Sequence, residues 1–494
     1  MKRTLSFLIA SVMILTCGCS GSGDTASKEM ASAEESASPA AVSAESVATD
    51  FGHYVFQYGG PTEAPSVVNT DPSERVDITI WSDPNWEFTA DNGNTYTQEE
   101  FFQETWARFA ASYPGAAIND VSTLTYPSAE RDEKISTAMQ TGELPDVIFG
   151  SFFSVGSRTY DGLYVPVDDA IPEEVQSDIA DTVWDLVTVN GNVYCYPFAQ
   201  GLGFLAYNAD MFRQAGLDDY IGDKYSFANW SPDDYLSIIK TLKENLDEGI
   251  VPTNVWCKGT DGDTWNQLFL RMFGAEWFDE NGKVIVNEDE RAVQALQYLK
   301  DIYDAGYTNA DPSTVKSSEV RANMNNLLTA IAPFQQGTVL VAEDAMNAGS
   351  SPEYDLRVAY IPGEENPQVF SYVYGFCVID TGNETAQQVV KDYLTWLNTE
   401  PNLMKEASRM GFVRESMISS DADTDSRKEA YLDAMQYIVN FNNNTIAYTQ
   451  LRNALYPQLQ AVYAGDKTPK EALNDYAAEA NQIIEKAQKD SIFR

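Results

Sequence analysis

The sequence predicts an α/β protein in which two lobes enclose a cleft. Apolar runs of strand length alternate along the chain with longer stretches whose apolar residues recur at helical spacing, and this alternation is typical of sheets that carry helices on both faces. With the N-terminal segments described below set aside, more than about 400 residues remain, which exceeds what one hydrophobic core usually serves. A segment that suits a hinge lies between the two expected halves.

The hinge candidate is the segment 189–217. An Asn-Gly pair at 190–191 is a strong hairpin-turn signal, and the strand that follows it is expected to break at Pro197. A Gly-Leu-Gly sequence at 201–203 frees the backbone between two strand-like runs. A short helix then ends at Gly216, a residue type favoured at helix C-termini.

Helices are indicated by caps and apolar stripes. Ser-Pro-Asp-Asp at 231–234 and Thr-Pro-Lys-Glu at 468–471 each place a capping hydroxyl, a first-turn proline and acidic residues before an apolar stripe. Further stripes at helical spacing lie at 101–113, 293–303 and 389–397.

Strands are indicated by short apolar runs between these helices. The runs lie at 76–81, 146–149, 339–342, 357–361 and 372–379. Because strands and helices alternate, the sheets are expected to be covered on both faces.

The first residues predict export. Two basic residues precede an apolar run at 5–15, which has about half of the ~20 residues needed to span a bilayer as a helix, so residues 1–18 are predicted to be a cleaved signal peptide. A small residue precedes Cys19, as in lipoprotein cleavage sites, and Cys19 would then receive diacylglycerol. Cys17 as the lipidated residue and secretion without a lipid are the alternatives.

Two further segments precede the folded body. Residues 19–50 are rich in Ser, Ala, Glu and Gly, a composition that buries too little apolar surface to fold, and they are predicted to be a disordered tether. Residues 51–75 contain several aromatic side chains and form an N-terminal extension whose packing the sequence does not show.

The composition limits the partners. The formal net charge is −42 and the pI is about 4.1. Such a field repels phosphate backbones and anionic lipids, so nucleic acid is not expected as a partner, and neutral or cationic ligands fit better. Much of the acidity is equally well explained by solubility. No second apolar run approaches membrane-spanning length, and a soluble monomer is expected.

Catalytic and cofactor sites are not indicated. The single histidine, His53, lies outside the main body, so neither a Ser-His-Asp triad nor a histidine metal site can be built in the cleft. The sequence at 201–206 fits a dinucleotide-binding pattern but precedes a strand-like run rather than opening a helix. Residues 279–283 hint at a calcium loop but lack the later glutamate, and a tight turn is expected there. No cofactor and no metal are predicted.

Three cysteines remain in the body after processing. Cys195, Cys257 and Cys377 are odd in number and widely spaced, so a disulfide framework is not indicated and all three fit small buried apolar residues. One pair could still form in an oxidising exterior, and the sequence does not decide between these states.

The segment 189–217 closely resembles its counterpart in the extracellular solute-binding proteins of ABC importers, the family that includes bacterial maltose- and oligosaccharide-binding lipoproteins. The resemblance recurs in order along the chain. Val76 to Trp81 is similar to the family's first strand, the Gly-Glu-Leu-Pro-Asp-Val sequence at 142–147 to its second-strand motif, and 374–379 to its return strand. Together these segments cover nearly everything after residue 75. The resemblance implies a periplasmic-binding-protein-like fold of type II, with two discontinuous α/β lobes joined by a hinge.

The resemblance also implies where the chain passes between the lobes. Crossings are expected near 200–206, 372–376 and 411–415. Lobe 1 would then comprise residues 76–201 and 374–412, and lobe 2 residues 202–373 and 413–494. A ligand that touches both lobes would stabilise the closed state, which the importer recognises.

Ligand contacts are expected where strands end at the crevice between the lobes. The candidates are Trp81, Ser82 and Asp83 after the first strand, Phe152 after the second-strand motif, Gln200 at the first crossing, Trp265 after an acidic loop, Glu343 and Asp344 at the end of the 339–342 strand, and Tyr374 at the second crossing. An aromatic ring under the apolar face of a sugar, with carboxylates and amides at its rim, is an apt combination. Trp81, Trp265 and Tyr374 are best placed by the family pattern.

The sequence therefore predicts a lipid-anchored, non-enzymatic binding protein on the extracellular face of the cell membrane. It would capture a carbohydrate, with an oligosaccharide expected, and deliver it to the permease subunits of an ABC transporter. The alternative from another class is a secreted glycoside hydrolase or lyase, which could use similar aromatic platforms and two carboxylates. A peptide, polyamine or metal chelate is the alternative ligand within the same fold.

Overall fold

The structure is a computed structural model that describes residues 75–82, 87–89, 95–112, 118–126, 130–151, 153, 155–258, 263–399, 413–416, 426–441 and 445–492. The chain divides into two units, Met1–Ala41 and Val42–Arg494, and every described residue belongs to the second. The predicted signal peptide, the lipidation of Cys19, the tether and all but the last residue of the 51–75 extension lie outside the described residues.

Strands and helices alternate along the described chain as predicted. The strands are β1 (Val76–Ser82), β2 (Glu87–Thr89), β3 (Thr95–Thr97), β4 (Ile118–Thr125), β5 (Val147–Ser151), β6 (Thr188–Val189), β7 (Asn192–Val193), β8 (Tyr196–Asn208), β9 (Phe227–Ala228), β10 (Ile331–Gln335), β11 (Leu356–Ala359) and β12 (Phe370–Val378). The helices are α2 (Gln98–Ser112), α3 (Arg131–Thr141), α4 (Val155–Tyr160), α5 (Glu173–Gln176), α6 (Asp181–Val187), α7 (Ala209–Ala215), α8 (Pro232–Asn245), α9 (Asp263–Phe269), α10 (Glu290–Asp304), α11 (Ser317–Asn325), α12 (Gln336–Asn347), α13 (Glu384–Thr399), α16 (Lys428–Met435), α17 (Tyr448–Ala464) and α18 (Pro469–Asp490).

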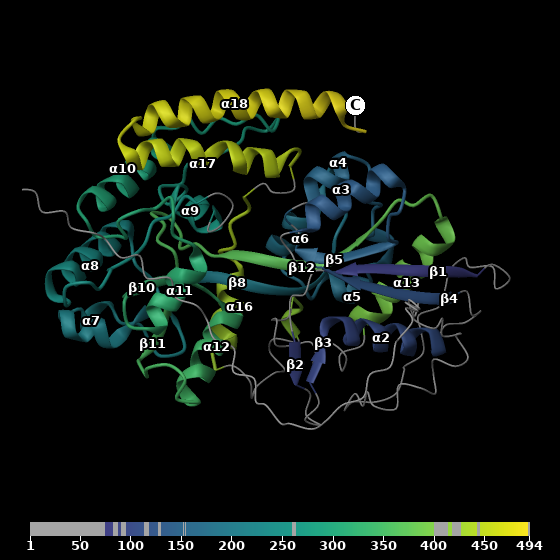
Figure 1. Cartoon of the computed structure of the whole chain (residues 1–494), viewed down its shortest axis with the longest axis horizontal. Coiled ribbons are helices and arrows are strands. Elements are labelled where there is room, and N and C mark those ends of the chain that lie inside the picture. The colour runs from purple at the N-terminus through teal and green to yellow at the C-terminus, as the bar shows by residue number, and fades with distance from the viewer. Residues whose placement is uncertain are drawn as a thin grey trace, which may run out of the picture. The chain divides into compact units, whose positions relative to one another are not determined.

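One sheet runs through the described part of the chain in the strand order β4-β1-β5-β12-β8-β11-β9, and β10 also pairs with β8. β1 is parallel to both β4 and β5, whereas β12 is antiparallel to β5 and to β8. Figure 1 shows α3 and α4 on one side of the parallel strands and α2 on the other. Because helices cover both faces, the parallel strands can be almost wholly apolar, as β5 is.

β8 is a single continuous strand of 13 residues, so the predicted break at Pro197 is wrong. Pro197 is accommodated by a bulge in the pairing with β12. Tyr374 lies opposite Ala199 and Gly375 opposite Pro197, which leaves Phe198 without an opposite residue. The ladder is already disrupted there, so the missing N–H of the proline does not end the strand.

Two hydrophobic cores are built on either side of this central pair of strands. The first gathers residues of β1, β5, α2 and α13, and the second gathers residues of α8, α10, α17 and α18. β8 and β12 contribute to both: Phe198 and Val373 lie in the first core, and Leu205 and Phe370 in the second. These strands are therefore the elements that join the two cores, as the hinge hypothesis requires, while the lobe boundaries given above stay a prediction.

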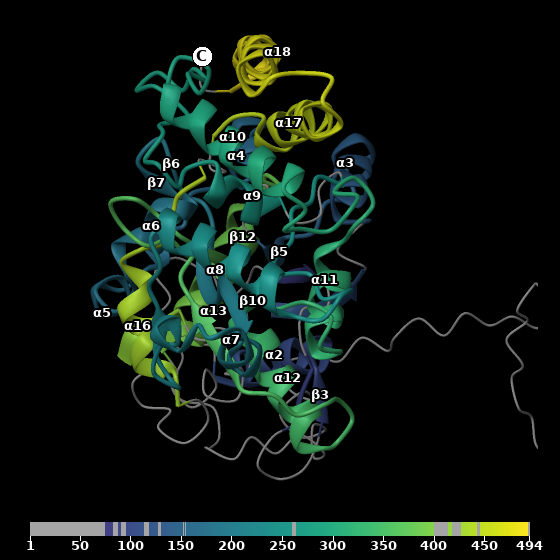
Figure 2. The same ribbon diagram turned by 90° about the vertical axis from the view of Figure 1, so that its left-hand side faces the viewer.

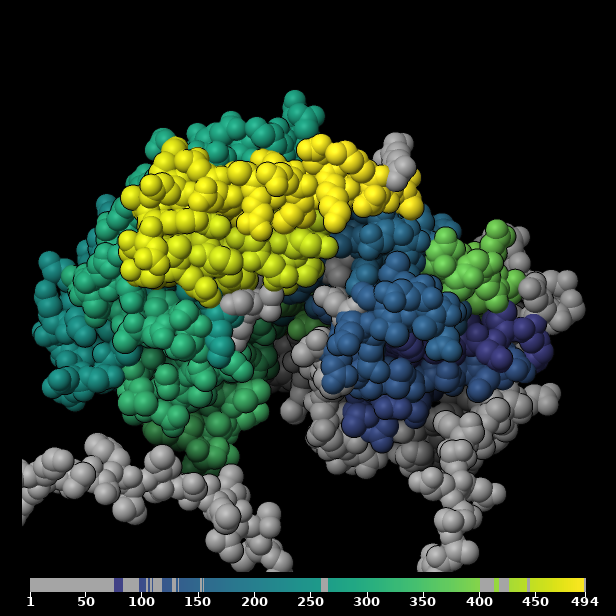
Figure 3. Space-filling view, turned by 45° about the horizontal axis from the view of Figure 1, so that its top comes forward, coloured from purple at the N-terminus to yellow at the C-terminus, as the bar shows by residue number. Residues whose placement is uncertain are grey.

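The C-terminal helices pack along one edge of this arrangement. Figure 2 shows α17 and α18 side by side, next to α10, and both contact α10. α17 also contacts α4 of the first core, and in the space-filling view the two helices (yellow) reach from the second-core residues (teal) toward the first-core residues (blue) (Figure 3). No helix among the described residues is long and apolar enough to cross a membrane.

The local turn and cap predictions are confirmed. Asn190 and Gly191 have φ of 49° and 82° and join β6 to β7, as a two-residue hairpin requires. Asn208 caps α7, which ends at Gly216 with φ of 76°. The expected capping boxes are present at Ser231 of α8 and at Thr468 of α18.

The strand predicted at 339–342 is wrong, because these residues lie within α12. Only Val339 and Ala342 are buried, while Val341 is 67% exposed. Burial at positions three residues apart is the pattern of a helix with one covered face. A run of four apolar residues does not by itself distinguish that pattern from a buried strand.

Candidate functional site

The carboxyl ends of the parallel strands meet at one edge of the sheet. The backbone N–H of Tyr126, which follows β4, donates to the carbonyl of Ser82, the last residue of β1, at 3.0 Å. The guanidinium of Arg131 donates to the hydroxyl of Ser151, the last residue of β5, at 2.8 Å. On β12, Tyr374 lies directly opposite Ser151. Polar and aromatic side chains from four strands therefore gather at this edge, the usual place for ligand contacts in open α/β sheets.

Trp81 and Ser82 occupy this edge as predicted from their position after the first strand. Trp81 is half-buried, and its ring meets Tyr126 edge-on with the centroids 6.1 Å apart. Ser82 is buried, with its hydroxyl 3.5 Å from the hydroxyl of Thr125. Part of the indole of Trp81 thus stays accessible beside a second aromatic ring.

Gln200 lies on β8, one of the strands that join the two cores, rather than on an open surface. Its side chain is 2% exposed. The amide oxygen accepts a hydrogen bond from the hydroxyl of Ser371 on β12 at 3.0 Å, and the amide nitrogen donates to the sulfur of Met435 in α16 at 3.5 Å. Gln200 therefore ties β8 to β12 and to α16, while its place at a crossing between lobes stays a prediction.

A continuous series of aromatic rings connects the two cores, and we call it the ring series. Trp265 of α9 meets Phe370 edge-on at 4.6 Å, Phe370 meets Tyr372 at 4.6 Å, and Tyr372 meets Phe153 at 5.3 Å. Phe153 follows β5 and packs against both cores. The ring series therefore runs from the second core along β12 to the strand-end edge of the first.

Trp265 is nearly enclosed in this arrangement. Only 2% of its surface is exposed, because Phe370 of β12 and the second core cover it. In this conformation Trp265 supports the neighbouring rings, whereas the half-buried Tyr372 and Phe153 present part of their surface. The guanidinium of Arg452 on α17 lies 5.5 Å from the Phe153 ring, so one cation accompanies the exposed end of the series.

The residues predicted from the sequence do not include Phe153, Phe370, Tyr372 and Arg452. A signal was present for two of them, because Phe370, Tyr372 and Tyr374 alternate along β12 and so share one face of the strand. No local pattern marks Arg452, which reaches the site from a helix almost 300 residues further along the chain than Phe153. Asp83 and Phe152, and the acidic loop before Trp265 up to residue 262, lie outside the described residues.

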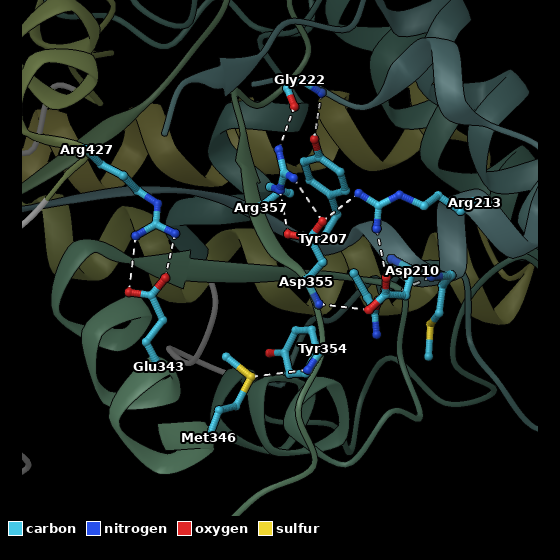
Figure 4. A network of polar contacts seen from close by, with 12 residues as sticks. Tyr207, Asp210, Arg213, Gly222, Glu343, Met346, Tyr354, Asp355, Arg357 and Arg427 are labelled. Atoms are coloured by element: carbon cyan, nitrogen blue, oxygen red, sulfur yellow. Dashed lines mark hydrogen bonds and ion pairs between the residues drawn. The ribbon is translucent and has the colours of Figure 1, made fainter. Parts of the chain in front are cut away.

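Glu343 and Asp344 do not join the other candidates. Because 339–342 is helical, both lie on α12 and not at a strand end. Glu343 accepts two hydrogen bonds, of 2.6 and 3.2 Å, from the guanidinium of Arg427, while Asp344 is exposed. Figure 4 shows Glu343 and Arg427 facing each other at the edge of a separate polar network.

That network lines a cavity of about 710 Å³ between α12 and β11. Asp355 is one of its lining residues and accepts hydrogen bonds from Arg357 at 2.6 and 2.9 Å and from Arg213 at 2.6 Å (Figure 4). Burial by itself raises the pKa of Asp355, but the two guanidinium groups outweigh it and hold that pKa below its ordinary value. The carboxylate of Asp355 is thus paired with both guanidinium groups.

Within the described ranges no group of three or more His, Cys, Asp or Glu residues could hold a metal ion. Residues 279–283 form the expected tight turn: the Asp279 carboxylate accepts from the backbone N–H groups of Asn281 and Lys283, and Phe278 bridges to Val284.

Comparison with known proteins gives one family. The model of the family described as bacterial extracellular solute-binding protein matches residues 93–404, which is more than half of the chain. Among curated proteins, the arabinooligosaccharide-binding protein of Bacillus subtilis is 28% identical over 215 residues, which are 41% of this chain and 44% of that protein. The chain thus spans about half the length of this relative.

Solved structures show the same fold. The cyclic alpha-maltosyl-1,6-maltose binding protein from Arthrobacter globiformis is similar with a TM-score of 0.66 at 19% identity, over 83% of this chain and 100% of that chain. The sugar-binding protein MalE from Xanthomonas citri is similar with a TM-score of 0.66 at 15% identity, over 84% of this chain and 98% of that chain. The prediction of a periplasmic-binding-protein fold is therefore confirmed.

Proposed function

The chain belongs to the bacterial extracellular solute-binding proteins, and on that premise we propose that it captures an oligosaccharide at the ring series and delivers it unchanged to the permease of an ABC importer. The observation that carries the proposal is the position of this series. Phe370 and Tyr372 lie on β12, one of the strands that join the two cores, and Trp265 and Phe153 pack against them from either end. A ligand that lies on the half-buried rings of Tyr372 and Phe153 would contact the second core and the strand-end edge of the first.

The chemistry of the site supports a carbohydrate. Sugar rings offer an apolar face of C–H groups that packs on aromatic rings, and their hydroxyls need polar partners at the rim. Trp81, Tyr374 and the hydroxyl of Ser151 line the adjacent strand-end edge, and the guanidinium of Arg452 lies beside Phe153. The names of the similar proteins, which bind arabino-oligosaccharides or a cyclic maltosyl-maltose, agree with this class of ligand.

Closure of the two lobes is the proposed means of capture. β8 and β12 pair along their length and supply side chains to both cores, so a change in their bend moves one core relative to the other. A ligand with differential affinity for the closed arrangement shifts the population toward it. The importer then recognises the closed form. Lobe boundaries near 201, 373 and 412 are part of this proposal.

The lipid anchor is a separate proposal. The N-terminal sequence supports diacylglycerol at Cys19, followed by a tether to residue 50 that keeps the monomer at the extracellular face of the membrane. Metabolic labelling with a radioactive fatty acid tests it. Loss of the label in Cys19→Ala, together with its retention in Cys17→Ala, supports the anchor. Absence of the label from both variants contradicts it.

A ligand screen separates binding from catalysis. The protein is incubated with arabino- and malto-oligosaccharides, its thermal unfolding is recorded, and the sugars are analysed by mass spectrometry. We expect one sugar class to raise the unfolding midpoint and to be recovered intact, since a ligand at 100 times its Kd adds about 2.7 kcal/mol to the free energy of unfolding.

The other outcomes of this screen would indicate an enzyme or a different class of ligand. Cleaved sugars would favour the glycoside hydrolase or lyase, against the non-enzymatic role that membership of a binding-protein family supports. Stabilisation by peptides, polyamines or metal chelates, with none by any sugar, would keep the fold and reject the carbohydrate.

A further inference from the structure

Two cysteines that the proposed function does not use lie on the two joining strands. Cys195 immediately precedes β8, and Cys377 is the penultimate residue of β12. The antiparallel register pairs Tyr196 with Phe376. One step further along the same register brings Cys195 opposite Cys377, although about 180 residues separate them in the chain.

The two side chains lie on the same face of β12. A β-carbon added at Gly375 would lie only 2.6 Å from the sulfur of Cys195, so the Cys195 thiol sits directly over Gly375. Residues two apart on a strand share a face, and Cys377 is two residues beyond Gly375. The Cys377 thiol is within hydrogen-bond reach, and this contact, together with burial, raises the pKa of Cys195 well above its ordinary value.

We propose that Cys195 and Cys377, which are free thiols in the structure, become a disulfide when the exported chain folds. Opposite residues of an antiparallel pair have α-carbons about 4.5 to 5.5 Å apart, within the range of about 4.4 to 6.8 Å that disulfides span. Extracellular proteins fold in surroundings where such bonds form and persist. The third thiol, Cys257, lies in the other core and has no part in the pair.

The reaction needs a disulfide-bonded oxidant. One cysteine thiolate attacks the oxidant and releases one of its sulfurs as a thiol, and the second cysteine then displaces the other sulfur, so that both protein thiols lose their protons and the oxidant is reduced to two thiols. Cys195 is 0% exposed and Cys377 is 7% exposed. The exchange therefore occurs while the strands are still pairing, and the finished bond is shielded from reductants.

The bond would link the two ends of the chain segment that contributes to the second core. Most of that core is built from residues between Cys195 and Cys377. The cross-link lies among first-core residues, on the far side of the bulge at Phe198 from Gly203. It would fix the register of β8 against β12 at that end and leave the remainder of both strands free to bend.

Refolding under two redox conditions tests the proposal. The full chain is denatured and reduced, then refolded with reduced glutathione alone or with a mixture of reduced and oxidised glutathione. Remaining thiols are blocked with N-ethylmaleimide in denaturant, and tryptic peptides are identified by mass spectrometry. Trypsin places Cys195, Cys257 and Cys377 on the separate peptides 159–213, 244–258 and 358–391.

We expect the oxidised sample to contain peptide 159–213 joined to 358–391, with Cys257 alkylated, and to unfold a few degrees higher than the reduced sample. Cys257→Ala should keep this difference, and Cys195→Ala or Cys377→Ala should abolish it. The comparison of the two samples of the unaltered chain needs no variant to fold. Refolded protein in which both Cys195 and Cys377 are alkylated, joined to glutathione or joined to Cys257 would overturn the proposal.

Discussion

Phe370 of β12 lies across Gly203 of β8, and a β-carbon at position 203 would come within 2.0 Å of the Phe370 ring. The two residues are paired in the antiparallel register, and Phe370 in turn supports Trp265 and Tyr372. Gly203, which was predicted to free the backbone of the hinge, therefore has a second structural role. It leaves the space that the centre of the ring series occupies.

Gly203→Ala should displace Phe370 and weaken both stability and ligand binding. Overpacking of this kind costs about 1 to 3 kcal/mol of the free energy of unfolding, measurable by denaturant titration. Gly201→Ala is the matched control, because a β-carbon at 201 meets no heavy atom within 4 Å. Equal effects of the two substitutions would show that glycine flexibility matters and the Phe370 contact does not.

Trp81→Ala and Trp265→Ala should separate a ligand contact from a supporting ring. Trp81 is half-buried at the strand-end edge, so its loss should weaken sugar affinity by about 1 to 3 kcal/mol with little change in unfolding without ligand. Trp265 is 2% exposed, so its loss should lower the free energy of unfolding by about 3 to 5 kcal/mol as well as affinity. Calorimetric titration and thermal unfolding of both variants measure this. The opposite assignment of the two effects would contradict the described packing.

Glu343→Gln should destabilise the protein without changing ligand affinity. Arg427 is 2% exposed on its side chain and pairs with Glu343, so removal of the carboxylate weakens the partner of a buried cation. We expect a loss of about 1 to 3 kcal/mol in the free energy of unfolding. Asp344→Asn, one residue further along α12 and exposed, should change it by less than about 0.5 kcal/mol. A selective loss of sugar affinity in Glu343→Gln would instead restore the original ligand-contact prediction.

Asp355→Asn should destabilise the protein at neutral pH and much less in acid. The folded-state pKa of Asp355 lies below the unfolded-state value of about 3.9, because Arg357 and Arg213 outweigh the effect of burial. The stabilisation by the ionised carboxylate is therefore present above that unfolded-state value and is lost as the pH falls through the folded-state pKa.

The difference in the free energy of unfolding between the unaltered chain and Asp355→Asn should be about 1 to 2 kcal/mol at pH 7, because the partly exposed network is screened by solvent. It should shrink toward zero as the pH falls below the unfolded-state value and through the lower folded-state pKa. A difference that stays constant with pH would mean that the shape of the side chain matters and its charge does not.

Features that depend on neighbouring residues could be predicted from the sequence. The hairpin at 190–191, the helix caps at Ser231 and Thr468 and the stop at Gly216 each rest on contacts within a few residues, and all are present. The break at Pro197 was wrong because its outcome depends on β12, which supplies the bulge from far along the chain.

Part of the candidate site could be predicted in the same way. Trp81 and Tyr374 lie at the strand-end edge, Trp81 next to the last residue of β1 and Tyr374 opposite the last residue of β5. The burial of Trp265 beneath Phe370, the pairing of Glu343 with Arg427 and the meeting of Cys195 with Cys377 could not be foreseen. Each joins residues more than about 80 positions apart.

The sequence by itself determined the alternation of strands and helices, the caps and turns, and, through its ordered motifs, the family. The tertiary structure alone decided which aromatic rings of the ring series are buried and which are half-buried, where Glu343 lies, and that two thiols face each other. The physical reason is the distance along the chain between the residues that interact. Capping and turn formation are settled by hydrogen bonds within one or two turns of chain, whereas burial and pairing depend on side chains that only the folded sheet brings together.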